Sequence, residues 1–294
     1  EGLTLVYIDS TIGWRSVQDN AFADSPSNYV TASGGTEVTC GDFKTHIFTG
    51  PGTFTVTNGG NSCGSNAVDY LVVAGGGSGA AYGANNQGLG GGGAGGFRLS
   101  NSYSLPAPTT SPLANPTGLP VSVQGYPITV GAGGPAANLP GPCNSQSGAA
   151  GSNSIFSTIT SAGGGYDDVT GCGAAIAGGS GGGGGRGNST SQTGGAGNTP
   201  PVSPPQGQNG GAGTPMPEQG SPAPAPSRNG GGGGGAGATG SNGGSPGSGA
   251  GGVGSYIAPG FVGPTAPSYG TAGPVSSTRY FAGGGGGAGG SGGQ

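Results

Sequence analysis

The sequence predicts an all-β and irregular fold without helix, in which a small N-terminal β module precedes a glycine-rich domain of packed extended rods. Glycine supplies 79 of the 294 residues and gathers in six runs of three or more. The 25 prolines cluster in the connectors between those runs. No stretch repeats its apolar residues with the period of a helix. The runs begin at Gly75, Gly90, Gly163, Gly181, Gly230 and Gly283.

The separation of glycine from proline indicates how the runs are arranged. A collagen triple helix needs glycine at every third position, whereas glycine comes in blocks here. Extended helices of the polyproline II type have three residues per turn and no internal hydrogen bonds, so their N–H and C=O groups point sideways. Neighbouring rods can satisfy one another if every contact residue is glycine. Proline has no N–H and falls in the connectors.

The first 30 residues are predicted to be an attachment segment. Leu3 to Ile8 is mostly apolar and β-branched, so it predicts a strand, and Trp14 is expected to pack against it. Residues 31–74 then form the small β module, and residues 75–294 form the glycine-rich domain of rods and loops.

Two signals define the β module. Residues 45–49 and 53–57 alternate in polarity on either side of a Gly-Pro-Gly turn, which predicts a hairpin. Residues 68–73 supply a further strand that leads directly into the first glycine run. The expected core of the module is Phe48, Phe54, Val56, Leu71 and Val73.

Composition limits how such a chain is stabilised. Hydrophobic residues make up 30% of it and charged residues 5%, with a formal net charge of −4. Ordering a residue costs about 1–2 kcal/mol of backbone entropy, and glycine loses the most. An ordinary core of these residues is too small to offset that cost. The remaining sources of stability are backbone hydrogen bonding and burial of surface between chains. We therefore expect a homo-oligomer, either a trimer or a filament.

Composition also excludes several partners and activities. The longest apolar run, Tyr70 to Ala74, is far shorter than the roughly 18 residues of a membrane span, so no membrane insertion is expected. Six basic residues do not suit binding to nucleic acid. Matches to G-x-G-x-x-G arise in any glycine tract and lack the helix that dinucleotide binding requires. We expect a non-enzymatic protein with no catalytic, cofactor or metal site.

The few residues capable of acid–base chemistry are isolated. His46 is the only histidine and lies in a predicted strand, with Asp42 too far along that strand to orient its ring. A packed histidine is therefore expected. Asp167 and Asp168 form the only acidic pair. They either help to bind a cation or, as we favour, lie in a solvated turn.

Four cysteines lack the close spacing of zinc or redox motifs. One alternative is two disulfides, the first across the predicted hairpin and the second between the remaining two cysteines. The other alternative, equally consistent with the spacing, is four free thiols. The residues concerned are Cys40, Cys63, Cys143 and Cys172.

One connector concentrates aromatic residues. The insert between Ser255 and Tyr280 carries Tyr256, Phe261 and Tyr269 between two glycine runs. Aromatic loops on a rigid scaffold suit contact with a receptor or a neighbouring subunit. The competing interpretation is that the rings fill gaps where the rods end.

Two segments resemble a known family. Residues 42–56, DFKTHIFTGPGTFTV, and residues 68–77, VDYLVVAGGG, resemble the glycine-rich fibre proteins of tailed bacteriophages, those of marine and cyanobacterial phages most closely. Residues 90–98, 126–134 and 151–165 resemble further blocks of the same family. The likeness extends over about residues 30–294.

The resemblance implies a tail-fibre or adhesin protein of the virion. Such proteins stack glycine rods into a compact tip whose loops touch the host, so a host cell-surface glycan or protein is the expected partner. The first 30 residues would join this tip to a shaft or baseplate. The alternative is a self-assembling extracellular glycine-rich filament or cell-surface structural protein, since the same packing serves a filament.

Overall fold

The computed structural model describes residues 5–10, 13–16, 27–82, 88–102, 110–138, 145–169, 174–185, 192–214, 229–244, 247–275 and 278–289. The elements are β1 (Leu5–Tyr7), β2 (Trp14–Ser16), β3 (Val30–Ser33), β4 (Thr36–Cys40), β5 (Phe43–Ile47), β6 (Gly52–Gly59), β7 (Ala67–Val68), β8 (Leu71–Val73), β9 (Ala81–Tyr82), β10 (Phe97–Ser100), β11 (Ala114–Asn115), β12 (Leu119–Pro120), β13 (Gly125–Thr129), β14 (Ser145–Gln146), β15 (Ser154–Phe156), β16 (Ile159–Ser161), β17 (Ser255–Ile257), η2 (Pro259–Phe261), η3 (Gly263–Ser268), β18 (Thr271–Ala272) and β19 (Arg279–Phe281). Helix is confined in these residues to the 3-10 segments η2 and η3, so the predicted all-β and irregular class is confirmed.

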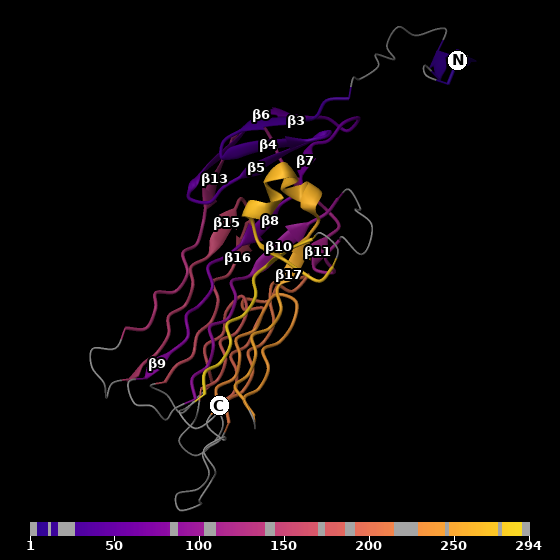
Figure 1. Cartoon of the computed structure of the whole chain (residues 1–294). Helices are drawn as coiled ribbons and strands as arrows, with labels where there is room; N and C mark the ends of the chain where they lie inside the picture. The colour runs from indigo at the N-terminus through magenta and orange to yellow at the C-terminus, as the bar shows by residue number, and fades with distance from the viewer. Residues whose placement is uncertain are drawn as a thin grey trace, which may run out of the picture.

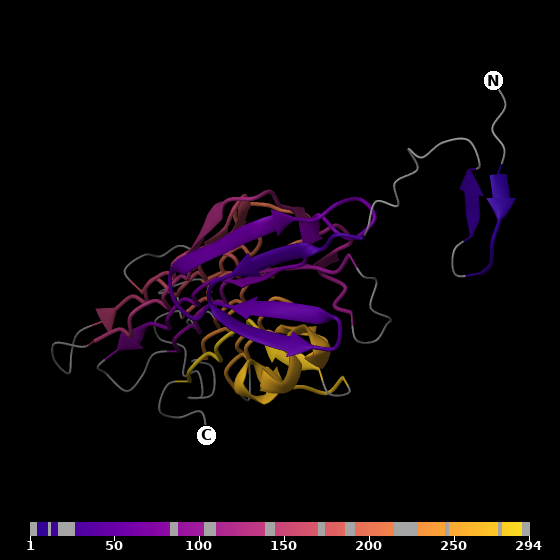
Figure 2. The same cartoon turned by 90° about the horizontal axis from the view of Figure 1, so that it is seen from above.

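Most of the sheets gather at one end of the molecule, and the glycine runs extend from that end as a bundle (Figure 1). The largest sheet has the strand order β16-β15-β13-β6-β3. Strands β13, β15 and β16 follow the first glycine runs in the chain. The sheet therefore joins the predicted β module to strands from the glycine-rich domain. Seen from above, the β4–β5 hairpin lies beside this sheet, and the 3-10 segments lie next to the hairpin (Figure 2).

Two hydrophobic cores lie on either side of β8. The first contains Phe54, Val56, Tyr126 and Phe156, and the rings of Phe54 and Phe156 meet edge to face at 5.8 Å. Tyr70 and Val72 also point into this core. The neighbouring Leu71 and Val73 point to the opposite face, since side chains alternate along a strand.

That opposite face packs against the second core. Its buried members include Phe97 and Leu99 of β10 and Ile257 of β17, and Leu71 and Val73 are packed against them. The uninterrupted apolar run of β8 is thus explained by burial on both faces. The core expected for the β module is therefore divided between two clusters.

The predicted hairpin is wrong in its pairing. Both segments form strands, but β5 pairs with β4 in one sheet, and β6 pairs with β3 and β13 in another. The Gly-Pro-Gly turn therefore changes sheets. Phe48 lies just before the turn and packs against the first core, so burial of this ring accompanies the separation of the two strands.

The N-terminal strand pairs as a separate hairpin. β1 pairs antiparallel with β2, and the rings of Tyr7 and Trp14 lie 5.4 Å apart, as expected for Trp14. Figures 1 and 2 show this hairpin apart from the rest of the described chain. Trp14 is 67% exposed, and Val6, Tyr7 and Ile8 are about half exposed.

Strand pairing continues directly into pairing of the glycine runs. β8 and β10 are antiparallel, with Val73 opposite Phe97. Beyond the sheet, the Ala74 N–H donates to the Gly96 carbonyl at 3.0 Å, and the Gly77 N–H donates to the Gly93 carbonyl at 2.8 Å. The interval between these bonds is three residues, which is the period of a polyproline II helix. The register of the rods is inherited from the strands.

Residues 89–96 form the central rod of the bundle. Its N–H groups at 91 and 94 donate to the run at 229–236, and those at 93 and 96 donate to the run at 161–166. Its carbonyls accept hydrogen bonds from the runs at 74–79, 178–185 and 283–288. Each neighbour is met at intervals of three residues, so bonds leave the rod sideways in several directions. The predicted packed rods are confirmed.

Three rods form the interior of the bundle. Every residue of the stretches 90–96, 178–185 and 229–236 is buried. In the second and third of these stretches each N–H donates a hydrogen bond, mostly to a carbonyl of another run. Backbone hydrogen bonding within one chain thus stabilises the glycine runs, and oligomerisation stays a prediction.

Close approach, and not left-handed backbone, explains the glycines of the rods. A Cβ on Gly233 would lie 2.0 Å from the Gly92 carbonyl oxygen, and one on Gly91 would lie 2.1 Å from that of Gly285. The oxygen of the neighbouring rod occupies the space a side chain would need. Left-handed φ values occur among the described glycines only outside the runs, for example at Gly34 and Gly60. Glycine is required here by packing.

We predict that Gly233→Ala unfolds or strongly destabilises the bundle, because the methyl group would displace the backbone of the central rod. The expected loss exceeds about 3 kcal/mol, at the upper end for overpacking. Urea unfolding of parent and variant measures it. Gly133→Ala is the control, since its Cβ would lie 3.7 Å from the nearest atom, the Gly76 carbonyl oxygen. Equal unfolding midpoints for the two variants would contradict the packing argument.

Candidate functional site

The end of the bundle farthest from the five-stranded sheet is the candidate site. We call it the distal end; β9 pairs there with β14 (Figure 1). The chain repeatedly leaves the described bundle here and returns to it. At each of four connectors, the residues on either side hydrogen-bond to each other. These bonds run from Asn138 N–H to Gln146 Oε1 (2.9 Å), Gly185 N–H to Gln192 Oε1 (2.9 Å), Thr214 N–H to Asn229 O (2.9 Å) and Gly244 N–H to Gly247 O (3.0 Å).

Asp167 is the central polar group of the distal end. Its side chain is fully buried, and its carboxylate accepts N–H bonds from Gly90 at 2.7 Å and Gly185 at 3.1 Å. Gly90 begins the central rod and Gly185 ends another interior rod. One carboxylate therefore ties together two rods, and the prediction of a solvated turn is wrong for this residue.

Burial raises the pKa of the Asp167 carboxyl to about 6, although the two N–H bonds act to lower it. The negative charge of the adjacent Asp168 acts in the same direction as burial. Desolvation disfavours the charged form more strongly than two hydrogen bonds favour it.

Gln192 and Asp168 extend this polar cluster. The Gln192 Nε2 group donates to the Asp168 backbone carbonyl at 2.9 Å, while its Oε1 accepts from Gly185. The Asp168 carboxylate accepts from the Ser147 hydroxyl at 2.6 Å. Both termini of the connector at 186–191 are thus bonded to one another and to the acidic pair.

Asn229 plays the equivalent part at the connector 215–228. Its side chain is buried, and its Nδ2 donates to the Gly244 carbonyl at 2.5 Å. Its backbone N–H donates to the Thr214 hydroxyl at 2.9 Å. The proline-rich connector therefore starts and ends on ordered, hydrogen-bonded residues of the bundle.

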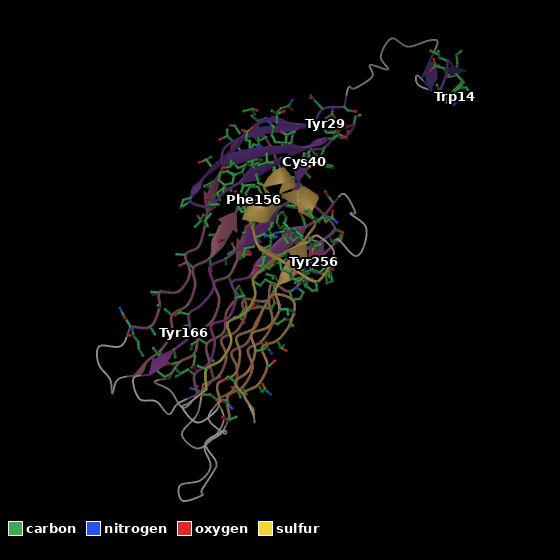
Figure 3. The ribbon with its side chains drawn as sticks, viewed as in Figure 1. Trp14, Tyr29, Cys40, Phe156, Tyr166 and Tyr256 are labelled. Carbon is green, nitrogen blue, oxygen red and sulfur yellow. The ribbon has the colours of Figure 1, made fainter. Side chains whose placement is uncertain are left out.

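The aromatic insert lies at the opposite end, beside the sheets. Tyr256 is in β17, and its ring lies 5.2 Å from that of Tyr280, while Phe261 and Tyr269 are half-buried against the second core. Figure 3 shows Tyr256 beside the sheets and Tyr166 toward the distal end. The Phe261 carbonyl accepts from the Thr45 hydroxyl of β5 at 2.9 Å. Packing explains the positions of these rings, and their contact with a receptor or neighbour stays a prediction.

Two of the cysteines can be placed. Cys40 and Cys63 are exposed free thiols, so the bridge between them is not formed. Cys143 and Cys172 lie outside the described residues. For the first pair, the free-thiol alternative is the one found.

His46 has a structural position, as expected. Its Nδ1 lies 2.8 Å from the Gly34 carbonyl oxygen, and its ring meets Phe54 edge to face at 5.1 Å. The described residues contain no cluster of three or more His, Cys, Asp or Glu side chains suited to a metal ion. Within the same residues, no helix has the length and apolar character of a membrane span.

The distal cluster was not predicted from the sequence. A signal was present, because Asp167 follows the run at 163–165 after one residue and Asn229 directly precedes the run at 230–235. A polar side chain at the end of a glycine run can accept or donate the backbone hydrogen bonds that the run leaves there. Such residues mark where rods terminate.

Comparison with known proteins finds one family. Residues 48–294 match the model of a family described as a glycine-rich domain. No curated protein and no solved structure was found to match the chain.

We predict that Asp167→Asn changes the pH dependence of stability between about pH 4 and 6. A pKa that is higher in the folded than in the unfolded chain means that the folded chain binds more protons in this range, so parent stability falls as pH rises. The stabilisation lost is up to about 3 kcal/mol. Asparagine does not titrate, so the stability difference between parent and variant should change across this range and stay level on either side. A constant difference from pH 3 to 8 would contradict the prediction.

Proposed function

The chain belongs to the glycine-rich domain family, and on this premise we propose that it is a non-enzymatic fibre or adhesin protein of a bacteriophage. Its connectors at the distal end contact a host cell-surface glycan or protein. The likeness of residues 42–56 and 68–77 to phage fibre proteins supports the virion as its location.

The main support for this proposal is that the flanking residues of several connectors lie at one end of the bundle and are held there by hydrogen bonds. The residues flanking 139–144, 186–191, 215–228 and 245–246 hydrogen-bond to each other and belong to ordered rods. Segments with fixed bases lose less conformational entropy on binding than segments of a flexible chain. Sequence can vary in such connectors without disturbing the rods, which suits a protein that must match a receptor.

The distal connectors suit contact with the host better than the aromatic insert does. Phe261 and Tyr269 already pack on the second core, and the Tyr256 ring contacts the Tyr280 ring at a tilt. Tyr256, Phe261 and Tyr269 are only partly buried, and they lie near the sheets. A contact made there is better suited to a neighbouring subunit than to a host surface at the distal end.

The alternative function is a self-assembling extracellular filament or cell-surface structural protein. The exposed Val6, Tyr7, Ile8 and Trp14 of the β1–β2 hairpin favour assembly, since an isolated two-stranded hairpin is marginal without a packing partner. A phage fibre predicts a closed assembly, such as a trimer, whereas a filament predicts an open one. Electron microscopy of the purified chain distinguishes the two.

Replacing residues 215–228 by a Gly-Ser segment of equal length should abolish binding to host cells while leaving the bundle folded. The measurement is retention of the fluorescently labelled protein on a panel of bacterial strains that includes marine cyanobacteria. Thermal unfolding of each variant reports whether the rods are intact.

The matched control replaces residues 103–109 in the same way. This connector is flanked by Ser102 and Thr110, and Thr110 accepts a bond from Tyr256 near the sheets. Binding is expected to survive that change. Equal binding by both variants, or no binding of the parent to any strain, would contradict host attachment through the distal end.

A further inference from the structure

A groove runs along the bundle between three glycine rods. It has a volume of about 330 Å³ and is lined by Gly76, Gly77, Gly79, Ala80, residues 89–94, Gly283, Gly285, Gly286 and Ala288, all of them glycine or alanine except Leu89. The central rod forms its floor and the other two rods form its walls. At about 3.1 Å per residue, the lining part of the floor is about 19 Å long.

The central rod carries two backbone donors without acceptors among the described residues, one in the floor of the groove at Gly92 and one just beyond its lining at Gly95. Between 89 and 97, every N–H of the central rod donates a hydrogen bond except those of Gly92 and Gly95, taking the described residues as a whole. The N–H groups at 91 and 94 point to one neighbouring rod, and those at 93 and 96 point to another. Gly92 and Gly95 form the third row of the same three-residue repeat. Leu89 begins this row and donates to the Ala288 carbonyl, so the row lacks acceptors among the described residues from Gly92 onward.

A wall of the groove carries the complementary acceptor. Gly77 lines the groove, and its carbonyl, which lies beside the Cα of Gly92, accepts no hydrogen bond from any described residue. A rod in the interior donates hydrogen bonds to some of its neighbours and accepts them from others. The free donors and the free acceptor at the groove offer an additional rod both kinds of bond. The groove therefore has the hydrogen-bonding pattern of a vacant rod position.

Three glycines in the walls of the groove are less tightly packed than the glycines of the interior. A Cβ would meet its nearest atom at 3.5 Å on Gly76, at 3.2 Å on Gly79 and at 3.3 Å on Gly285. In the interior of the bundle the same distance is about 2 Å, as at Gly233. A Cβ on Gly285 would lie 3.3 Å from the Gly92 nitrogen, and a Cβ on Gly76 would lie 3.8 Å from the Gly95 nitrogen. Side chains here would cover the free N–H groups, and glycine leaves them accessible.

We propose that this groove binds one extended, glycine-rich polypeptide segment of another chain, as a further rod of the bundle. The segment presents a carbonyl to Gly92 and, three residues along, a carbonyl to Gly95. One of its own N–H groups donates to the Gly77 carbonyl. Glycine is needed wherever the segment faces the floor, because rods in this bundle approach until a carbonyl oxygen occupies the Cβ position.

The lining favours a peptide backbone over other ligands. Charged and aromatic side chains, which would recognise a phosphate or the face of a sugar, are missing from the residues that line the groove. Its polar groups are backbone donors and acceptors spaced at intervals of three residues. Of the common ligands, an extended polypeptide repeats complementary groups at that interval.

The test uses the peptide acetyl-Gly-Gly-Ser-Gly-Gly-Gln-amide as the probe and the whole chain, labelled with ¹⁵N-glycine. Hydrogen–deuterium exchange of individual amides is followed by NMR. In the free protein the amides of Gly92 and Gly95 should exchange much faster than that of Gly91. Saturating peptide should slow both by at least about tenfold and leave Gly91 and Gly93 unchanged.

Two variants and a second peptide control for folding. Gly76→Leu should remove the effect of the peptide by filling the groove, while Gly133→Leu, whose Cβ has room outside the groove, should retain it. A peptide with valine in place of glycine should not protect the Gly92 or Gly95 amide of the unaltered chain. This second control uses no variant, so it does not depend on whether Gly76→Leu folds.

Two results would overturn the proposal. Exchange that the glycine peptide does not alter means that the groove holds water only. Protection of Gly92 and Gly95 equal to that of Gly91 before any peptide is added means that this chain closes the groove by itself.

Discussion

The approach of one backbone to another at the Cα of a glycine is the interaction on which this structure depends. At Gly91, Gly183 and Gly233, a carbonyl oxygen of a neighbouring rod lies only about 2 Å from the position that a Cβ would take. The second Cα hydrogen then faces an oxygen, an arrangement typical of weak Cα–H···O contacts. N–H···O bonds leave the same rod every third residue. Together these bonds offset the large conformational entropy that glycine loses on ordering. The chain has too few apolar side chains to offset that loss by hydrophobic burial.

The two hydrophobic cores decide where the rods begin. They lie at the sheet end, with β8 buried between them, and rods continue from the ends of β8, β16 and β19. Pairing of β8 with β10 sets which glycines face each other in the rods that follow. Apolar burial and backbone bonding are therefore divided between the two halves of the molecule. Apolar burial at the sheet end sets the register of the rods, and backbone hydrogen bonding holds the rods together along most of their length.

Among the described residues, the distal end has no hydrophobic core and only the two-stranded sheet of β9 and β14, and polar side chains join the ends of its rods. Asp167 is buried although burial raises its pKa, and its two oxygens accept the N–H groups of Gly90 and Gly185 where two rods end. Gln192 accepts the Gly185 N–H with a neutral group, and the Asn229 amide donates to the Gly244 carbonyl. Both hydrophobic cores therefore lie away from the residues that flank the distal connectors.

Much of the fold was predictable from the distribution of glycine and proline. Blocks of glycine with proline only between them specify extended rods bonded sideways, because no other residue tolerates contact on every side and proline lacks the donor. The strands at 45–49, 53–57 and 68–73 were predictable from alternation and apolar runs. Their partners were not, since a Gly-Pro-Gly turn suits a hairpin as well as a crossing between sheets, and burial of Phe48 and Phe54 decided between them.

The sequence by itself thus determined the kind of contact that this chain makes, and the tertiary structure alone decided which segments make it. Glycine runs are chemically equivalent, so nothing local distinguishes the central rod at 89–96 from the outer one at 283–288. Their places follow from strand pairing and the two cores, which depend on residues far apart in the chain. The same reason applies to the candidate site. Burial of Asp167 and packing of Phe261 and Tyr269 are properties of rods and sheets brought together, and no window of sequence contains them.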